Sequence, residues 1–202
     1  MKKSLILLAG FPGTGKSYLS NLIMEKFPEI YLISPDELKE KNWDKFGFEN
    51  LEDKEKLIQR SWKEYYSELE NSFQKGKSVI SDYPFSDKQK STIEKLTEKY
   101  GIQVITIRLI ADLDVLFERQ KIRDLDDSRH LGHILTCYNK DNKEIEHQTA
   151  DNLLDYQEFI KRCTTRGYGE FNLGLLFEID VTDFSKVDYD SLLENLEKEL
   201  RI

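Results

Sequence analysis

The chain has 202 residues, 39% of them hydrophobic and 34% charged, a composition typical of an ordinary globular protein with one domain. Its formal net charge of −8 disfavours broad nucleic-acid binding, which needs a basic surface, and is compatible at most with a small local basic cleft. The two cysteines, Cys137 and Cys163, form no CxxC pair, and no apolar stretch is as long as a membrane span. We therefore expect a reduced, cytoplasmic protein that does not enter a membrane.

Signals for strands and helices alternate along the chain. Apolar runs bounded by turn residues predict the strands, and apolar residues three or four apart predict the helices. The predicted strands are 5–9, 30–34, 77–82, 102–110 and 175–181. The predicted helices are about 16–27, one that follows Ser34, 51–73, 86–101, one that follows Asp112, about 150–163 and 191–200. This alternation predicts an α/β fold with a parallel sheet and helices on both faces.

Capping signals set several of these helix boundaries. Ser34 is a candidate N-cap with Glu37 three residues later, and "SDKQ" at 86–89 is a second capping-box pattern. Gly101 is a candidate left-handed cap at the end of a helix, and Asp112 is a candidate N-cap for the next one.

The segment from about 120 to 150 is the most polar and least periodic part of the chain. It predicts a mobile lid rather than core. We therefore expect one domain over residues 1–202, with a lid around 119–150.

The residues "GFPGTGKS" at 10–17 match the phosphate-binding pattern G-x-x-x-x-G-K-[ST]. The pattern could mark a plain glycine-rich turn, but here it lies between an apolar strand and an amphipathic helix, as a phosphate loop requires. Its glycines can adopt the positive φ values that let backbone N–H groups face an anion. Lys16 would reach the β- and γ-phosphates, and the Ser17 hydroxyl would bind Mg²⁺. The predicted nucleotide-binding residues are Gly10, Phe11, Pro12, Gly13, Thr14, Gly15, Lys16, Ser17 and Tyr18.

Two carboxylates follow predicted strands. Asp36 lies just after the second strand, and Asp82 closes the third. Because the carboxyl ends of parallel strands face the ligand crevice, Asp36 could accept the proton of an attacking hydroxyl. Asp82 could hold Mg²⁺ or a water bound to it. The alternatives are that Asp36 only complements a helix dipole and that Asp82 only caps a turn.

Arginines in and near the predicted lid could neutralise a transferring phosphoryl group. Arg119 and Arg123 are four residues apart and therefore share a helix face, and Arg129 follows them. The alternative for each is a solvated surface arginine paired with nearby acidic residues.

The three histidines, His130, His133 and His147, lie near Cys137. A zinc site is the alternative to contacts with substrate or phosphate. The spacings fit no common structural zinc site, so zinc is the less favoured interpretation.

In order and spacing, the phosphate loop, "ISPDELK", "VISDYPFSDKQKSTIEKLTEKYGIQV" and "DVLFERQKIR" resemble the kinase domain of bacteriophage polynucleotide kinase. They also resemble zeta-toxin-like and small-molecule P-loop kinases, and "RHLGH" is similar to a motif in bacterial ATP-binding proteins of this group. The resemblance covers about residues 4–133.

This resemblance implies a P-loop NTPase fold with strand order 2-3-1-4-5. It also implies Asp36 as general base and Arg119 as the lid arginine on the phosphates. The chain departs from the polynucleotide kinases at Lys39, where they have arginine, and at Pro84, where they have asparagine. Both departures affect substrate recognition, because lysine cannot make the bidentate phosphate contact of arginine.

The sequence as a whole predicts an ATP- and Mg²⁺-dependent kinase that acts on a hydroxyl of an unidentified small molecule. The catalytic residues predicted are Lys16, Asp36, Arg119, Arg123 and Arg129, with Ser17 and Asp82 at the metal. A polynucleotide or nucleotide kinase, a nucleotide-binding regulatory module without turnover, and a zeta-like toxin that acts on a nucleotide sugar are the alternatives.

Overall fold

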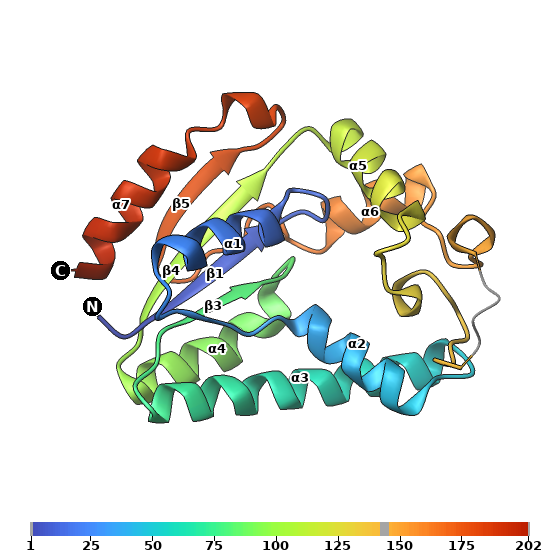
Figure 1. Ribbon diagram of the computed structural model, residues 1–202, viewed down its shortest axis with the longest axis horizontal. Coiled ribbons are helices and arrows are strands. Elements are labelled where there is room, and N and C mark those ends of the chain that lie inside the picture. The colour runs from blue at the N-terminus through green and yellow to red at the C-terminus, as the bar shows by residue number, and fades with distance from the viewer. Residues whose placement is uncertain (1, 142–145, 202) are drawn as a thin grey trace.

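The computed structural model describes residues 2–141 and 146–201, and in these ranges five parallel strands form one sheet of order β2-β3-β1-β4-β5 (Figure 1). The strands are β1 Ser4–Gly10, β2 Tyr31–Leu32, β3 Val79–Asp82, β4 Gln103–Ile110 and β5 Leu175–Asp180. The α-helices are α1 Lys16–Lys26, α2 Pro35–Phe46, α3 Leu51–Gln74, α4 Asp87–Tyr100, α5 Leu113–Leu125, α6 Tyr156–Thr165 and α7 Tyr189–Arg201. The short 3-10 helices are η1 Leu131–His133, η2 His147–Thr149 and η3 Phe184–Lys186. The predicted α/β fold and its strand order are confirmed.

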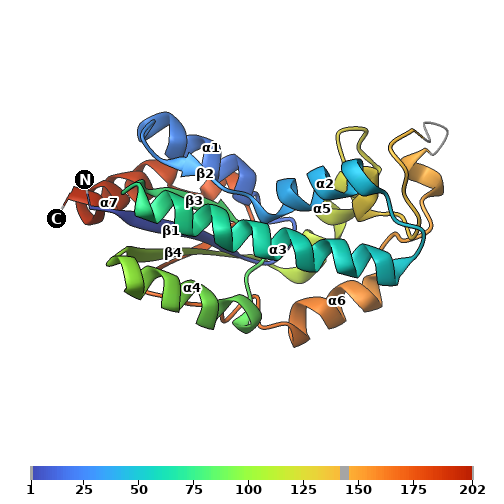
Figure 2. The ribbon, with the colours of Figure 1, turned by 90° about the horizontal axis from the view of Figure 1, so that it is seen from below.

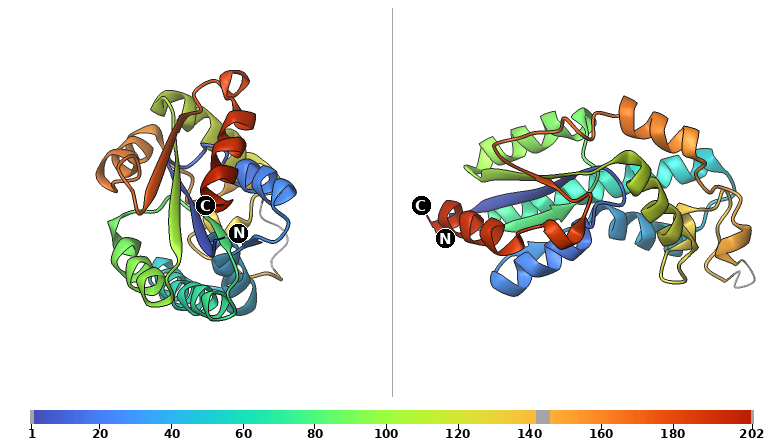
Figure 3. Two further views of the ribbon diagram at one scale, coloured as in Figure 1. Left: turned by 90° about the vertical axis from the view of Figure 1, so that its left-hand side faces the viewer. Right: turned by 90° about the horizontal axis from the view of Figure 1, so that it is seen from above.

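The central strand β1 supplies a core to each face of the sheet, because its side chains alternate between them. Leu5 and Leu7 pack in the core that α3 and α4 cover. Ile6 and Leu8 pack in the core that α1 and α7 cover. Figures 2 and 3 show these helix pairs on opposite sides of the sheet. The all-buried pattern of β1 explains why its sequence is continuously apolar rather than alternating.

The capping signals were confirmed except at one helix. Ser86 donates its backbone N–H to Gln89 Oε1 at 3.1 Å, Asp112 accepts from the N–H of Asp114, and Gly101 has φ 61°. Ser34 does occupy the N-cap of α2, but its side chain makes no capping hydrogen bond, contrary to the capping-box prediction.

Several predicted elements have different bounds in the structure, and two of these differences have a clear physical cause. The strand expected over 30–34 pairs as a strand only at Tyr31–Leu32, since the chain turns into α2 at Pro35. The helix expected at about 150–163 is α6, which begins only after the N-cap Asp155. Asp151, just before it, instead accepts a hydrogen bond from the backbone N–H of Thr136 at 2.8 Å.

The sequence predicted a lid that is not part of the core. In the structure, part of this segment packs in a small core of its own. Its first residues, 119–125, belong to α5, and residues 142–145 lie outside the described ranges. The part around 131–138 packs on α2 and α3 through a small core of Trp43, Phe48, Leu135 and Tyr138. Lys54 of α3 also donates to the Leu135 carbonyl at 3.0 Å. We call residues 126–155 the α5–α6 segment.

Gly132, in "RHLGH", packs directly against Trp43. A Cβ built on it would lie 2.4 Å from Cε3 of Trp43, whose side chain is almost fully buried. The glycine is therefore explained by the approach of backbone to the indole ring, without any contact to a ligand.

We predict that Gly132→Ala lowers the free energy of unfolding by about 1–3 kcal/mol, because the added methyl group overpacks the Trp43 ring. Urea unfolding monitored by circular dichroism measures the change. Ser128→Ala, at an exposed position of the same segment, is the control and should alter stability by less than about 0.5 kcal/mol. Equal stability of Gly132→Ala and the parent would contradict the packing role.

Candidate active site

The phosphate-binding pattern forms the turn between β1 and α1. Gly10, Gly13 and Gly15 have φ values of 105°, 82° and 79°, as the sequence predicted. A Cβ on Gly10 would lie 1.9 Å from the carbonyl oxygen of Leu109, so no larger residue fits where β1 ends. The turn leads directly into α1, whose N-terminus favours an anion.

Lys16 is buried and lies against the loop. Its ammonium donates to the carbonyls of Phe11 at 2.6 Å and Gly10 at 3.3 Å, and to Thr14 Oγ1 at 3.3 Å. Burial, followed by the charge of Arg123, lowers the pKa of Lys16 to about 7. No carboxylate lies within ion-pair distance of this ammonium in the described part of the chain, so an anionic ligand would stabilise its charged form.

Ser17 and Asp82 come together at the ends of α1 and β3. The Ser17 hydroxyl donates to Asp82 Oδ2 at 2.9 Å. The second carboxylate oxygen, Oδ1, is buried and lacks a hydrogen-bond partner among the described residues. Burial raises the pKa of Asp82, which a cation would reverse. This oxygen pair fits Mg²⁺, which usually takes one or two protein oxygens and completes its shell with phosphate and water.

Asp36, in the first turn of α2, forms an ion pair with Lys39. The Lys39 ammonium lies 2.9 Å from Asp36 Oδ1 and donates to the Tyr83 hydroxyl at 3.0 Å. Partial burial opposes ionisation of Asp36, but Lys39 outweighs it and holds the pKa of this carboxyl well below its usual range. Asp36 is therefore a carboxylate at neutral pH, aimed into the cavity that contains Lys16.

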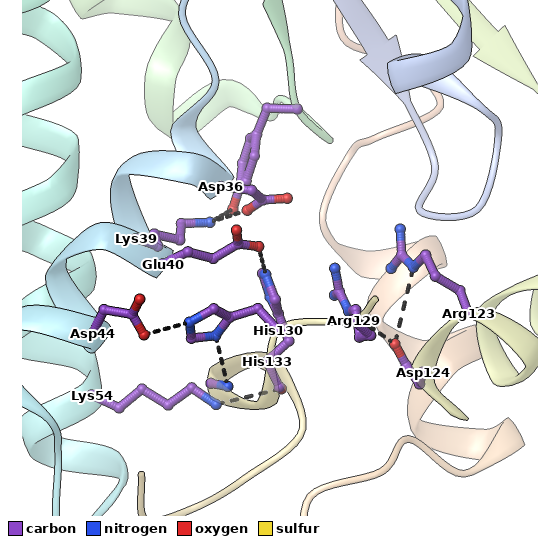
Figure 4. Close-up of polar contacts among 12 residues, drawn as sticks. Asp36, Lys39, Glu40, Asp44, Lys54, Arg123, Asp124, Arg129, His130 and His133 are labelled. Carbon is purple, nitrogen blue, oxygen red and sulfur yellow. Dashed lines mark hydrogen bonds and ion pairs between the residues drawn. The ribbon is translucent and has the colours of Figure 1, made fainter. Parts of the chain in front are cut away.

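Arg123 and Arg129 face the same cavity from the other side, as Figure 4 shows. Arg129 Nε lies 3.3 Å from Asp124 Oδ1, and Arg123 donates to Gln120 Oε1 at 2.6 Å. Both guanidinium groups thus lie across the cavity from Asp36, where the sequence predicted counter-charges.

The guanidinium of Arg119, which the sequence predicted on the phosphates, is bound within the protein. Its guanidinium donates to the carbonyls of Val181 and Thr182, each at 2.8 Å, and stacks over the Phe184 ring at 3.8 Å. These contacts fasten α5 to the end of β5. Arg119 still lines the cavity, but on the rim beside Gly13 and Phe184.

The histidines of "RHLGH" bind carboxylates of α2 (Figure 4). His133 Nε2 is 2.7 Å from Glu40 Oε1, and His130 Nε2 is 3.0 Å from Asp44 Oδ1. His130 Nδ1 accepts the N–H of Gly132 at 3.0 Å, so its Nε2 carries the proton that it donates to Asp44.

The third histidine completes the anchoring of this segment. His147 contacts the Arg129 carbonyl at 2.7 Å. Within residues 2–141 and 146–201, no group of three or more His, Cys, Asp or Glu side chains could hold a metal, so the zinc interpretation finds no site there. The histidines anchor the α5–α6 segment instead.

The cavity has a volume of about 510 Å³, and part of its wall was not predicted. Arg162 of α6, and Arg166 and Tyr168 after it, line it opposite α2. Arg166 and Tyr168 belong to the glycine-rich stretch "TTRGYGEFNLG" at 164–174, whose sequence gave no indication of its role. Its Gly169 packs so closely on the Phe11 ring of the phosphate loop that a Cβ would lie 2.8 Å away.

The chain belongs to the AAA domain family AAA_33, whose model matches residues 5–134. A candidate kinase from Chloroflexus aurantiacus J-10-fl is similar in structure over 98% of both chains, with a TM-score of 0.76 and 24% sequence identity. Mycobacterium tuberculosis APS kinase CysC, solved with AMPPNP and APS, has a TM-score of 0.56 and 15% identity over 100% of this chain and 99% of its own. Deinococcus radiodurans tunicamycin resistance protein has a TM-score of 0.54 and 16% identity, over 98% and 95% of the two chains.

These similarities define the fold of the chain as that of P-loop NTPases and related kinases. No curated protein matches the chain significantly in sequence. The resemblance to polynucleotide kinases and zeta toxins stays a prediction. No helix in the described ranges combines the length and the apolar character needed to span a membrane.

We predict that nucleotide binding at pH 8 is accompanied by uptake of roughly one proton. With a pKa of about 7, most Lys16 is neutral at pH 8, and phosphate favours its ammonium form. At pH 6 Lys16 is already protonated, so it takes up no further proton when the nucleotide binds. Calorimetry of ADP binding in buffers of different ionisation enthalpy measures the uptake.

Lys16→Arg is the matched control, since arginine keeps the charge and does not titrate in this range. It should bind nucleotide at pH 8 without proton uptake. Equal uptake by both proteins would place the titrating group elsewhere.

Proposed function

We propose that the protein is an ATP- and Mg²⁺-dependent kinase that transfers the γ-phosphate to a hydroxyl of a small molecule. The observation that carries this proposal is the shared cavity: the phosphate loop with Lys16, the Ser17–Asp82 pair and the ionised Asp36 all line it. A protein that only binds a nucleotide does not need the third of these groups, the Asp36 carboxylate. The fold shared with APS kinase, which was solved with AMPPNP and APS, supports the same assignment.

On the donor side, Lys16 and the loop amides bind the β- and γ-phosphates. Ser17 and Asp82 would hold Mg²⁺, which would supply positive charge to the β- and γ-phosphates. Arg123 and Arg129 face the γ-phosphate from the opposite wall and neutralise the charge on its oxygens. Arg119 shapes the rim of the nucleotide site through its contacts with Val181 and Thr182.

On the acceptor side, Asp36 accepts a hydrogen bond from the attacking hydroxyl and then its proton. The acceptor oxygen forms a bond to phosphorus as the bond from phosphorus to the leaving oxygen of ADP breaks. Because Lys39 keeps the pKa of Asp36 low, this carboxylate is a weak base that mainly orients the hydroxyl. Weak basicity suits phosphoryl transfer, in which positioning and charge stabilisation provide most of the catalysis.

We propose that the chain is a single-domain enzyme of the cytoplasm. Its lid lies around residues 119–150, and most of this lid belongs to the α5–α6 segment. The segment carries Arg129 to the cavity, and His130 and His133 hold it on α2. Closure over bound nucleotide would exclude water and limit hydrolysis of ATP.

We predict that Asp36→Asn lowers kcat by about 10²–10⁴-fold, because the amide can neither take the proton nor orient the hydroxyl equally well. The KM for ATP should stay nearly unchanged. The measurement is transfer of labelled γ-phosphate to an acceptor found by screening metabolites and oligonucleotides.

Glu37→Gln is the matched control on the same turn of α2, where Glu37 is exposed, and it should keep full activity. Full transfer by Asp36→Asn would show that the general-base assignment is wrong. Transfer only to oligonucleotide 5′ ends would favour a polynucleotide kinase. ATP binding without transfer to any compound would favour a regulatory module.

We predict that Lys39→Met shifts the acid limb of the pH profile of kcat/KM to higher pH. Removing the ammonium next to Asp36 raises the pKa of this carboxyl toward its usual range, so its reactive form is lost at a higher pH. Initial rates between about pH 3 and 8 test this. Lys41→Met, on the exposed side of α2, should leave the profile unchanged, and an unshifted limb in Lys39→Met would exclude control of Asp36 by Lys39.

A further inference from the structure

A second cavity, of about 1160 Å³, adjoins the proposed transfer site. Phe11 of the phosphate loop lines it, but Lys16, Ser17 and Asp82 do not. The two cavities share one set of wall residues: Lys39, Tyr83, Pro84, Cys163, Arg166 and Tyr168. This shared wall, which we call the junction, borders both cavities, and Asp36 lines the first of them.

Aromatic rings line the second cavity on the side of α3. Trp62 packs edge-on against Tyr83, with ring centroids 5.0 Å apart, and Tyr66 lies next to Trp62 at 5.8 Å. Residues after α6 form the opposite side, and α3 and α6 lie on the same side of the sheet (Figure 2). Such a surface suits the apolar faces of a small organic molecule.

Arg166 differs from the other cations around the junction. Lys39 is paired with Asp36, Arg129 with Asp124, and Arg162 with Glu158. In the described ranges Arg166 forms no ion pair, and its one hydrogen bond runs from Nη1 to the Tyr168 hydroxyl at 3.2 Å.

The Tyr168 hydroxyl lies next to the Arg166 guanidinium and adds a second hydrogen-bond donor. Its oxygen accepts from Arg166, and its own proton finds no acceptor among the described residues. The guanidinium and the O–H are thus two donors on one wall, a combination that binds oxyanions. Outside the junction, the second cavity is lined by the acidic Glu55, Asp87 and Glu170 and by the basic Lys88, so acidic side chains outnumber basic ones there. The junction is therefore the more favourable place for an oxyanion.

We infer that the phosphate acceptor is itself an anionic hydroxy compound, which carries a carboxylate or a phosphate group. This inference rests on the proposed kinase function. The oxyanion binds Arg166 and Tyr168, the body of the molecule lies against Tyr83 and Trp62, and its hydroxyl points to Asp36. Tyr83 links the two ends, since its hydroxyl accepts from the Lys39 that also holds Asp36.

The first test compares acceptors in matched sets that share a skeleton. Glucose, gluconate and glucose 6-phosphate form one set, and ribose and ribose 5-phosphate another. We expect kcat/KM for labelled phosphate transfer to be at least about tenfold higher for charged members than for neutral ones. The carboxylate and phosphate members identify which oxyanion is used. Equal or better transfer to neutral members would overturn the inference and leave the kinase function intact.

The second test uses Arg166→Gln, with Arg201→Gln on the exposed end of α7 as control. Arg166→Gln should raise the KM for a charged acceptor by about 10–100-fold and leave the KM for ATP unchanged. The control should change neither. An equal rise in the KM for ATP would place Arg166 at the donor site and overturn the inference.

Binding can be measured independently of transfer through Trp62. The chain has two tryptophans, and Trp43 is only 1% exposed, so Trp62 is the reporter of the second cavity. With Mg²⁺ and ADP saturating the donor site, glucose 6-phosphate or gluconate should change the fluorescence saturably, and glucose should not. The change should disappear in Arg166→Gln and in Trp62→Phe.

The two proposals can fail separately in this assay. Anion binding that depends on Arg166, without transfer to any alcohol, would refute the kinase function and keep the oxyanion site. A fluorescence change that is insensitive to Arg166→Gln would refute the oxyanion site, whatever the outcome of the transfer assay.

Discussion

The contact between Gly10 and the Leu109 carbonyl is the constraint on which the site depends. Only glycine tolerates both the φ of 105° and the close approach to that oxygen where β1 ends against β4. The resulting turn sends the chain back over the strand ends and starts α1 with Lys16 and Ser17. Because β3 is the other neighbour of β1, the same turn brings Ser17 to 2.9 Å from Asp82. A backbone constraint thus sets the geometry of the candidate metal site.

Around this loop, most of the charges are arranged in pairs, which explains how an acidic protein can line one cavity with many basic residues. Lys39 with Asp36 and Arg129 with Asp124 each offset the cost of desolvating a charge. Lys16 is one exception, since its ammonium donates to neutral oxygens and its pKa falls to about 7. A bound phosphate is the partner that this lysine lacks.

The sequence predicted those features that neighbouring residues determine. The phosphate loop, the capping box at Ser86 and the buried strand at 5–9 depend on spacing within a few residues, so their patterns are readable directly. The strand order was also predicted, through the resemblance to known kinases. The bounds of the short strand β2 were not predicted. They depend on where β2 pairs with β3, and the apolar run of β2 does not show this.

The roles of individual cavity residues depend on contacts between distant parts of the chain. Arg119 binds carbonyls 62 and 63 residues away, and no local pattern indicates that these compete with a phosphate. Arg166 and Tyr168 reach the site only because the stretch after α6 packs on Phe11 of the loop. Lys39 was noted as a departure from a known pattern, but its bond to Tyr83 spans 44 residues and emerges only in the fold.

Helix α2 connects the base to the proposed lid. Asp36 lies in its first turn, and Glu40 and Asp44 follow at intervals of four residues, so all three project from one side. Asp36 faces the cavity, while Glu40 and Asp44 bind the two histidines that follow Arg129 in sequence. The position of Arg129 relative to Asp36 is therefore fixed through α2 more directly than through the sheet. Any movement of α2 toward a bound acceptor would carry Asp36 and Arg129 together, so that the spacing between base and arginine is kept.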